Sequence, residues 1–421
     1  MPSPEDPGER KLSRRRFMKS AGLLLAAGVV GAGLGDVAVN LLKHEAAKEA
    51  SRQALRPSTT AGLGSPTRAP MYRTTPIGLR TSDSNPFSIF WITDTQFLSE
   101  ANPLLFQAQV NWIVNNWRAY NGKLVIHTGD IVQQGGVVSE WQNAHAAMST
   151  LSQNGIPYTW CAGNHDDFAN GDPTSGWIGN ASAPAFDPNV ASGHVNSLGY
   201  TTWAGDHHQG MNTAATFTAN GLKFLVVNIE WLAQPDALAW VGGILDNPAY
   251  ADHHVIVAPH AYMDYDGNLD DAKWGTMMAP FVGALTPILN NHPNVFLTLN
   301  GHFATDCGYN TPSPIITRNQ LMFDRQDSFD TSDGPEGRGV DDASLQPSIP
   351  DASKVGGATV MVLTFNTISN LISTSTFDVY TGMWRDNPEE QYTFTMFPSA
   401  PSNPDYGQRV IPRTVIPATI P

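Results

Sequence analysis

The chain has 421 residues, of which 41% are hydrophobic and 15% are charged. Its formal net charge is -14, from 24 basic and 38 acidic residues, and a surface of that sign repels a polyphosphate backbone at long range. These values exclude a globally disordered chain and argue against a nucleic-acid-binding scaffold. Phosphate chemistry is not excluded, because a bound metal ion reverses the local field.

The N-terminal segment, residues 1–42, has the layout of an export signal. A basic stretch from Ser13 to Lys19 precedes an apolar run from Ala21 to Leu34, and small residues are interspersed. The paired arginines with Phe17 and Lys19 after them resemble a twin-arginine signal, which implies the twin-arginine export machinery as a partner and a cargo that crosses a bacterial membrane folded. We expect a secreted, periplasmic or membrane-anchored protein. N-terminal anchoring stays an alternative, although the run is shorter than the ~18 residues of a usual span.

The rest of the chain divides into a linker and one folded domain. Residues 43–80 are rich in Ala, Ser, Thr, Gly and Pro, a composition that predicts a disordered linker. Residues 81–421 show no break that would mark a second folded domain. Two cysteines, Cys161 and Cys307, leave open either a single bridge in an exported protein or two buried thiols.

Beyond residue 80, short apolar runs alternate with segments of helical periodicity. Strands are predicted over Phe87–Thr93, Leu124–Thr128 and Tyr158–Cys161, with helices between them over Pro103–Tyr120 and Val138–Gln153. This strand-helix-strand order predicts an α/β fold.

The second half of the domain begins with a predicted loop. Residues 167–210 are rich in Gly, Asn, Asp, Pro and Ser, which indicates a long irregular segment. Ala214–Phe217 and Leu222–Asn228 flank an Asn-Gly pair and predict a hairpin. The remaining predictions are a helix over Asp236–Leu245, strands over Val255–Ala258, Val295–Leu299, Ala358–Phe365 and Ser373–Tyr380, and a second surface loop over Thr331–Pro350.

Five polar clusters each follow one of the apolar, strand-like runs. They are Asp94-Thr95-Gln96, Gly129-Asp130, Gly163-Asn164-His165-Asp166, His260 and Gly301-His302. In open α/β sheets, sites form at the carboxyl ends of strands, so we expect the five clusters to converge. Carboxylates, amides and imidazoles are metal ligands, and their convergence predicts a metal site.

In this order the clusters resemble the motifs of the calcineurin-like metallophosphoesterases, which run D-x-H, G-D-x-x-D/N, G-N-H-D/E, H and G-H-x-H. This chain has D-T-Q, G-D-I-V-Q, G-N-H-D, H and G-H-F-A, and the resemblance covers residues 85 to 305. It implies a single catalytic domain with a four-layer α/β/β/α sandwich and metals at one rim. It also implies hydrolysis of a small phosphate monoester or diester by metal-bound hydroxide.

The resemblance further implies two divalent metal ions and a role for each residue. Asp130 would bridge the ions, Asp94 would hold the first, and His165 would contact the phosphate and protonate the leaving oxygen. The second ion would be held by Asn164, His260 and His302. Two cations about 3.5–4 Å apart neutralise phosphate charge and activate water.

Two departures from the family pattern fall on the first metal site. Gln96 and Ala304 stand where the family has histidines. The site becomes oxygen-only, with Asp94, Gln96 and Asp130 as ligands and Asp306 as an added candidate. Oxygen ligands suit Mn, Mg or Ca, whereas the imidazoles of the second site suit Zn, Fe or Mn, so we predict a mixed pair with a weakly held or hard first ion.

Other interpretations stay open at several positions. Asp166 is a candidate to orient the His165 imidazole, and Gln133 stands where the family has Asp or Asn. His127 is expected to be packed within its strand, and His207 and His208 either lie on the surface or line the cleft. The alternative function is an exported binding protein that keeps the fold but has a depleted, non-catalytic metal site.

Overall fold

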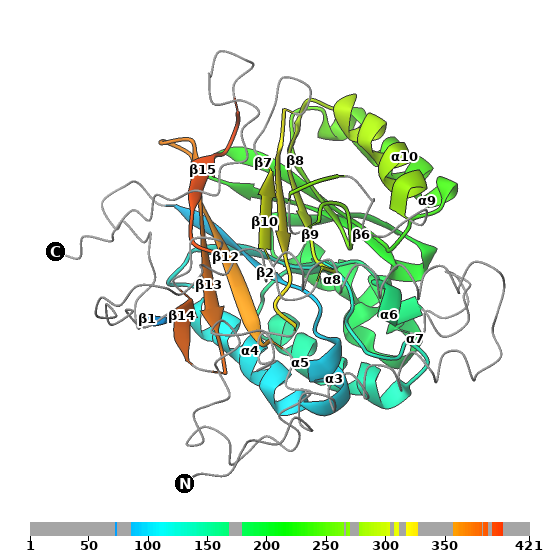
Figure 1. Cartoon of the computed structure of the whole chain (residues 1–421), viewed down its shortest axis with the longest axis vertical. Coiled ribbons are helices and arrows are strands. Elements are labelled where there is room, and N and C mark those ends of the chain that lie inside the picture. The colour runs from blue at the N-terminus through cyan, green and yellow to red at the C-terminus, as the bar shows by residue number, and fades with distance from the viewer. Residues whose placement is uncertain are drawn as a thin grey trace, which may run out of the picture. The chain divides into compact units, whose positions relative to one another are not determined.

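The computed structural model describes residues 72–73, 86–167, 179–264, 267–269, 278–303, 307–310, 317–326, 357–380, 382–385 and 390–398 (Figure 1). The chain divides into two units: residues 1–66 with 270–280, which lie almost wholly outside these ranges, and residues 67–269 with 281–421, which contain both sheets. The predicted signal, nearly all of the linker, the 331–350 loop, Ala304 and Asp306 lie outside the described residues. Within the described residues, no helix has the length and apolar character needed to span a bilayer.

The first sheet has the strand order β1-β14-β13-β12-β2-β3-β4, with β15 paired to β13. Its strands are β1 Tyr72–Arg73, β2 Phe87–Ile92, β3 Gly122–His127, β4 Tyr158–Trp160, β12 Thr359–Asn366, β13 Leu371–Asp378, β14 Met383–Arg385 and β15 Thr393–Thr395. The central strands β2, β3 and β4 run parallel, and β12 is antiparallel to β2. The carboxyl ends of β2, β3 and β4 therefore lie at one edge.

The second sheet has the order β10-β11-β9-β8-β7-β6-β5. Its strands are β5 Thr201–His207, β6 Asn212–Ala219, β7 Leu222–Ile229, β8 His254–Pro259, β9 Val295–Asn300, β10 Cys307–Asn310 and β11 Asn319–Phe323. The predicted β6–β7 hairpin is confirmed: Asn220 (φ 52°) and Gly221 (φ 77°) form its turn in the left-handed region that this kind of hairpin requires. Strands β7, β8, β9 and β11 run parallel.

Apolar residues of the two sheets form a shared core between them. Phe87 of β2 stacks on Phe365 of β12 with ring centroids 4.8 Å apart, and it meets Phe224 of β7 edge-on at 5.4 Å. Leu124, Ile256 and Leu297 belong to the same buried cluster.

Helices cover the outer face of each sheet (Figure 1). On the first sheet, α4 (Pro103–Asn116) and α5 (Val138–Gln153) bury apolar residues against β2 and β3, as the periodicity of the sequence predicts. On the second sheet, α9 (Pro235–Leu245) packs on β5 and β7, and α10 (Met278–Asn290) lies beside it. The architecture is the predicted four-layer α/β/β/α sandwich.

The prediction of a long irregular segment over residues 167–210 is wrong for its second half. Residues 179–210 form α7 Gly179–Ser182, η1 Pro184–Phe186, α8 Pro188–Ser197, strand β5 and η2 His208–Gly210. Asp187 caps α8 by accepting the N–H of Asn189 (2.9 Å), and Pro188 takes the first helical position, where no backbone donor is needed. Asp and Pro, which we took as signs of an irregular loop, thus begin a helix here.

Other elements were not predicted: α3 Gln96–Ala101, α6 Asn164–Asp167, η3 Pro248–Tyr250, α10, and the pair β10 and β11. Of the two alternatives for the cysteines, the structure shows two buried thiols, because Cys161 and Cys307 are not joined by a disulfide.

Candidate metal centre

Three of the predicted ligands lie just past strand ends with the same unusual backbone conformation. Asp94 (φ 51°), Asp130 (φ 51°) and His302 (φ 77°) all occupy the left-handed region, which non-glycine residues rarely adopt. Residues held there cost of order 1–3 kcal/mol each and concentrate at functional sites. The sheets therefore impose a turn at each of these three strand ends that aims the side chain at a common point.

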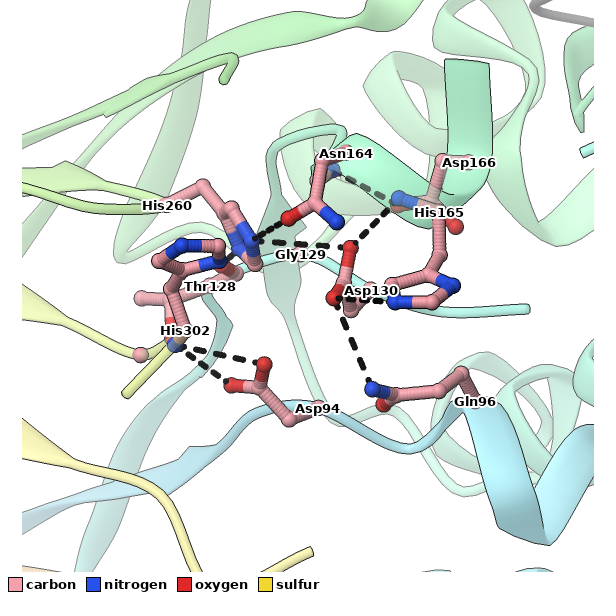
Figure 2. A network of polar contacts seen from close by, with 12 residues as sticks. Asp94, Gln96, Thr128, Gly129, Asp130, Asn164, His165, Asp166, His260 and His302 are labelled. Carbon is pink, nitrogen blue, oxygen red and sulfur yellow. Dashed lines mark hydrogen bonds and ion pairs between the residues drawn. The ribbon is translucent and has the colours of Figure 1, made fainter. Parts of the chain in front are cut away.

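The structure brings the predicted ligands of the second metal ion together (Figure 2). Ligand atoms of Asp130, His260 and His302 all lie within 4.8 Å of one another, and all three residues are buried. The Nε2 atom of His260 lies 3.0 Å from Asn164 Oδ1 and 3.5 Å from Asp130 Oδ1.

The two histidines of this cluster are held in the neutral form that binds metals. His260 Nδ1 donates to the Thr128 carbonyl (2.7 Å), which leaves Nε2 with its lone pair turned toward Asp130 and Asn164. Burial lowers the pKa of His260, and burial followed by the proximity of His260 and His165 lowers the pKa of His302 well below its usual value.

Glycine is required at two points where the backbone passes close to a carboxylate. A Cβ on Gly163 would lie 2.1 Å from Asp130 Oδ1, and a Cβ on Gly301 would lie 2.1 Å from Asp94 Oδ2. The Asp94 carboxylate also accepts the N–H of His302 at 3.1 and 3.2 Å. The glycines of the G-N-H-D and G-H motifs are therefore needed for close approach.

An ionised Asp94 carboxylate would need a cation beside it, because it is buried close to two other carboxylates. Burial raises its pKa well above the usual value, and the nearby carboxylates of Asp324 and Asp130 raise it further. A dication at this point would reverse the effect and hold the carboxylates ionised.

Gln96 lies at the position predicted for the first metal ion. Its Nε2 is 3.5 Å from Asp130 Oδ2 and also bonds Gln326 Oε1, while its Oε1 is buried with no hydrogen-bond partner among the described residues. Gln326 in turn donates to both oxygens of Asp324, at 2.9 Å from its backbone and 3.0 Å from its amide. Side-chain oxygens of Gln96, Gln326 and Asp324 thus lie near Asp94, in line with the oxygen-only first site that Gln96 and Ala304 predict.

Sequence reasoning missed Asp324 and Gln326. They follow β11, whose sequence Asn-Gln-Leu-Met-Phe starts with two polar residues and was not recognised as a strand. The same rule that found the other clusters, a polar run directly after an apolar strand, would have found Asp324-Arg325-Gln326 once β11 was recognised.

His165 is partly open to solvent, with a side chain 33% exposed against 2% for Asp130. Its backbone N–H donates to Asp130 Oδ1 (2.9 Å), its Nε2 lies 3.9 Å from Asp130 Oδ2, and its Nδ1 is 3.1 Å from the Gln133 carbonyl. An imidazole anchored on one side and open on the other can reach a substrate.

Asp166 does not orient this imidazole, contrary to the expectation from the sequence. Its two oxygens accept the backbone N–H groups of Ile131 (2.8 Å), Val132 (2.9 Å) and Gly163 (2.7 Å), and it is fully buried. The Asp166 carboxylate thus takes its hydrogen bonds from the backbone of the loops that carry Asp130 and Asn164, and not from the His165 imidazole. The carbonyl of Gln133 is the group that faces His165 Nδ1.

The donor set fits a pair of divalent metal ions. Asp130 lies among the candidate ligands, with His260 near its Oδ1 and Gln96 near its Oδ2, each at 3.5 Å, while Asp94 lies beside the backbone of His302 (Figure 2). The buried Oε1 of Gln96 and the convergent imidazoles supply the atoms that such ions need.

A four-layer α/β/β/α sandwich with carboxylates and imidazoles at the rim of its two sheets is the metallophosphoesterase fold. Residues 87–281 match the protein family described as "Calcineurin-like phosphoesterase". This match covers a little under half of the 421-residue chain.

One curated relative and several solved structures are similar to the chain. "Uncharacterized protein YvnB" of Bacillus subtilis (strain 168) is 27% identical over 263 residues, which are 60% of this chain and 18% of that protein, so the chain spans under a fifth of its relative. Purple acid phosphatase PPD1 from yellow lupin (Lupinus luteus) seeds is 11% identical with a TM-score of 0.45, over 74% of this chain and 54% of that one. GAP50, the anchor in the inner membrane complex of Plasmodium, is 13% identical with a TM-score of 0.41, over 75% of this chain and 90% of that one.

Proposed function

We propose that the chain is a calcineurin-like metallophosphoesterase, a phosphoric ester hydrolase that acts on small monoesters or diesters with two divalent metal ions. One observation carries the proposal: five candidate ligands from different strand ends meet in one cluster. They follow β2, β3, β4, β8 and β9 and are Asp94, Asp130, Asn164, His260 and His302, respectively. Three of them, Asp94, Asp130 and His302, have strained, left-handed backbone conformations.

The chemistry follows from what each group can do. Two bound dications neutralise the charge of a phosphate and lower the pKa of coordinated water toward 7. Asp130 would hold both ions, because its Oδ1 lies 3.5 Å from His260 Nε2 and its Oδ2 lies 3.5 Å from Gln96 Nε2. His165, whose side chain is 33% exposed and whose backbone N–H donates to Asp130, would contact the phosphate and donate a proton to the leaving oxygen.

The metal pair is proposed to be mixed. Neutral, buried His260 and His302 favour Zn, Fe or Mn in the second site. The oxygen groups of Asp94, Gln96 and Asp130 favour Mn, Mg or Ca in the first, which is the ion more easily lost.

The test is turnover of p-nitrophenyl phosphate and of its bis ester with added Mn or Mg. We expect Asp130→Asn and His302→Ala each to lower kcat/KM by on the order of 100-fold or more while the protein stays folded. His292→Ala, which removes a half-buried histidine paired with the exposed Asp246 (3.1 Å), is the matched control and should keep full activity. Unchanged activity in Asp130→Asn would overturn the proposed site.

The second candidate is a binding protein with the same fold and no catalysis, and the loss of both first-site histidines favours it. It predicts one tightly bound metal ion and no turnover of either ester at any Mn concentration. The enzyme proposal predicts activity that rises as a second ion binds.

Export by the twin-arginine route is also a proposal, supported by the pattern from Ser13 to Leu34. The double substitution Arg14→Lys with Arg15→Lys should retain the folded protein in the bacterial cytoplasm. Export at the normal level in this variant would favour a different route.

A further inference from the structure

A second group of metal-ligand side chains lies outside the centre described above. His207 ends β5, His208 begins η2, and Asp236 lies in the first turn of α9. One ligand atom from each lies within 4.8 Å of the others. The proposed phosphoesterase reaction uses none of the three.

Hydrogen bonds fix the orientation of His208 between two carboxylates. Its Nδ1 lies 2.8 Å from Glu230 Oε1, and its Nε2 lies 2.9 Å from Asp236 Oδ2. Glu230 is fully buried at the end of β7, whereas the side chain of Asp236 is 65% exposed. A buried carboxylate on one ring nitrogen, with the other nitrogen facing a further ligand, is how metal-binding histidines are usually held.

His207 adds the third ligand. Its ring centroid lies 4.1 Å from that of His208, and its Nδ1 is buried with no hydrogen-bond partner among the described residues. Burial, followed by the neighbouring His208, lowers the pKa of His207, so its imidazole is neutral and able to bind a metal at neutral pH. The second oxygen of Glu230 is likewise buried without a hydrogen-bond partner in the described part of the chain.

The backbone around His208 is held in an unfavourable conformation. His208 (φ 48°) and Gln209 (φ 55°) are both left-handed, and Gly210 follows at φ 96°. A Cβ on Gly210 would lie 2.7 Å from Pro188, so α8 packs tightly beneath this turn. The packed turn presents both histidines to Asp236.

We propose that His207, His208 and Asp236 bind one divalent transition-metal ion of the zinc type, separate from the active centre. Two imidazoles and a carboxylate are a ligand set that Zn²⁺ takes, and the exposure of Asp236 leaves a further position open to water. Glu230 would orient His208 through the hydrogen bond to its Nδ1, which leaves Nε2 to bind the ion.

The experiment measures Zn²⁺ binding to the full chain after removal of metals with EDTA. The Asp130→Asn/His302→Ala background disables the active centre, so binding there does not obscure the result. In this background we expect one equivalent of Zn²⁺ to bind, and one equivalent of Co²⁺ to give the visible absorption of a low-coordinate site. Adding His208→Ala or Asp236→Asn should abolish both signals, and adding Glu230→Gln should weaken binding by about 10- to 100-fold.

Asp236→Asn keeps the test decisive if His208→Ala fails to fold, because residue 236 is exposed. His292→Ala, which removes a half-buried histidine paired with a single exposed carboxylate, should leave the bound equivalent of Zn²⁺ in place. Equal Zn²⁺ binding with and without Asp236→Asn would overturn the proposal. So would no binding in the background protein, which would make the cluster a protonated histidine between two carboxylates and nothing more.

Discussion

The indole ring of Trp231 packs against the imidazole of His302, with ring centroids 4.3 Å apart, and it meets His260 at 5.8 Å. The structure places it half-buried beside the metal cluster, where its backbone N–H donates to the Ala162 carbonyl (2.9 Å) in the loop that carries Asn164. Trp231 thus connects the ends of β4, β7 and β9.

Substitution Trp231→Ala should weaken the second metal site. Without the indole, the His302 ring loses its packing partner, and we expect metal affinity to fall by about 10- to 100-fold, as for other groups that orient a ligand. Competition with a chelator measures this affinity. Trp231→Phe, which keeps an aromatic face, should stay within a few-fold of the natural protein. Equal loss in both variants would show that ring packing is not the cause.

Substitution Gln96→His should convert the first site to one that retains zinc. Gln96 already faces Asp130, and an imidazole there restores the donor that the family motif has. We expect zinc content after dialysis to rise from one toward two ions per chain. Gln153→His, at an exposed position near the end of α5, is the control for added histidine. If Gln96→His retains no more zinc than this control, residue 96 does not face the first ion.

Substitution Asp324→Asn should weaken the first site without unfolding the protein. Asp324 is buried, raises the pKa of Asp94 and holds Gln326 against Gln96. Asparagine keeps the shape and removes the charge, so we expect Mn affinity to fall about 10-fold, consistent with loss of a group that supports a metal ligand. Asp246→Asn, which changes an exposed carboxylate at the C-terminal end of α9, should leave Mn affinity unchanged. Activity that saturates at the same Mn concentration in both would contradict this role.

His127 gives a prediction about pH. Burial, followed by the proximity of His260, lowers its pKa to about 3, and its Nε2 lies 2.9 Å from Thr95 Oγ1, so the sequence-based expectation of a packed, hydrogen-bonded histidine is confirmed. Between pH 6.5 and 3 the unfolded chain binds a proton here that the folded chain does not, so folding free energy is lost as pH falls. From pH 7 to 5 this loss is about 2 kcal/mol.

The measurement compares urea unfolding of the natural protein and His127→Gln in EDTA at both pH values. All other groups titrate alike in the two proteins, so the natural protein should lose about 2 kcal/mol more than the variant. A parallel loss in both would mean that His127 is protonated in the folded state.

The sequence predicted well where strands are apolar and end abruptly. FSIFWI before Asp94 and VIVAP before His260 gave both the strand and the site residue, because the parallel strands end at one edge. Contacts between side chains could not be predicted in this way. That Asp166 accepts three backbone N–H groups, or that Gln326 reaches Gln96 across 230 positions, depends on how loops from different strands meet.

The left-handed conformations of Asp94, Asp130 and His302 lower the stability of the fold, although the proposed activity needs these side chains. Glycine adopts such dihedral angles without the steric cost that a side chain incurs. Asp94→Gly should therefore raise the melting temperature of the metal-free protein, and it also removes a buried carboxylate, while it abolishes turnover. Screens that select only for heat resistance would be expected to enrich inactive chains altered at these three positions.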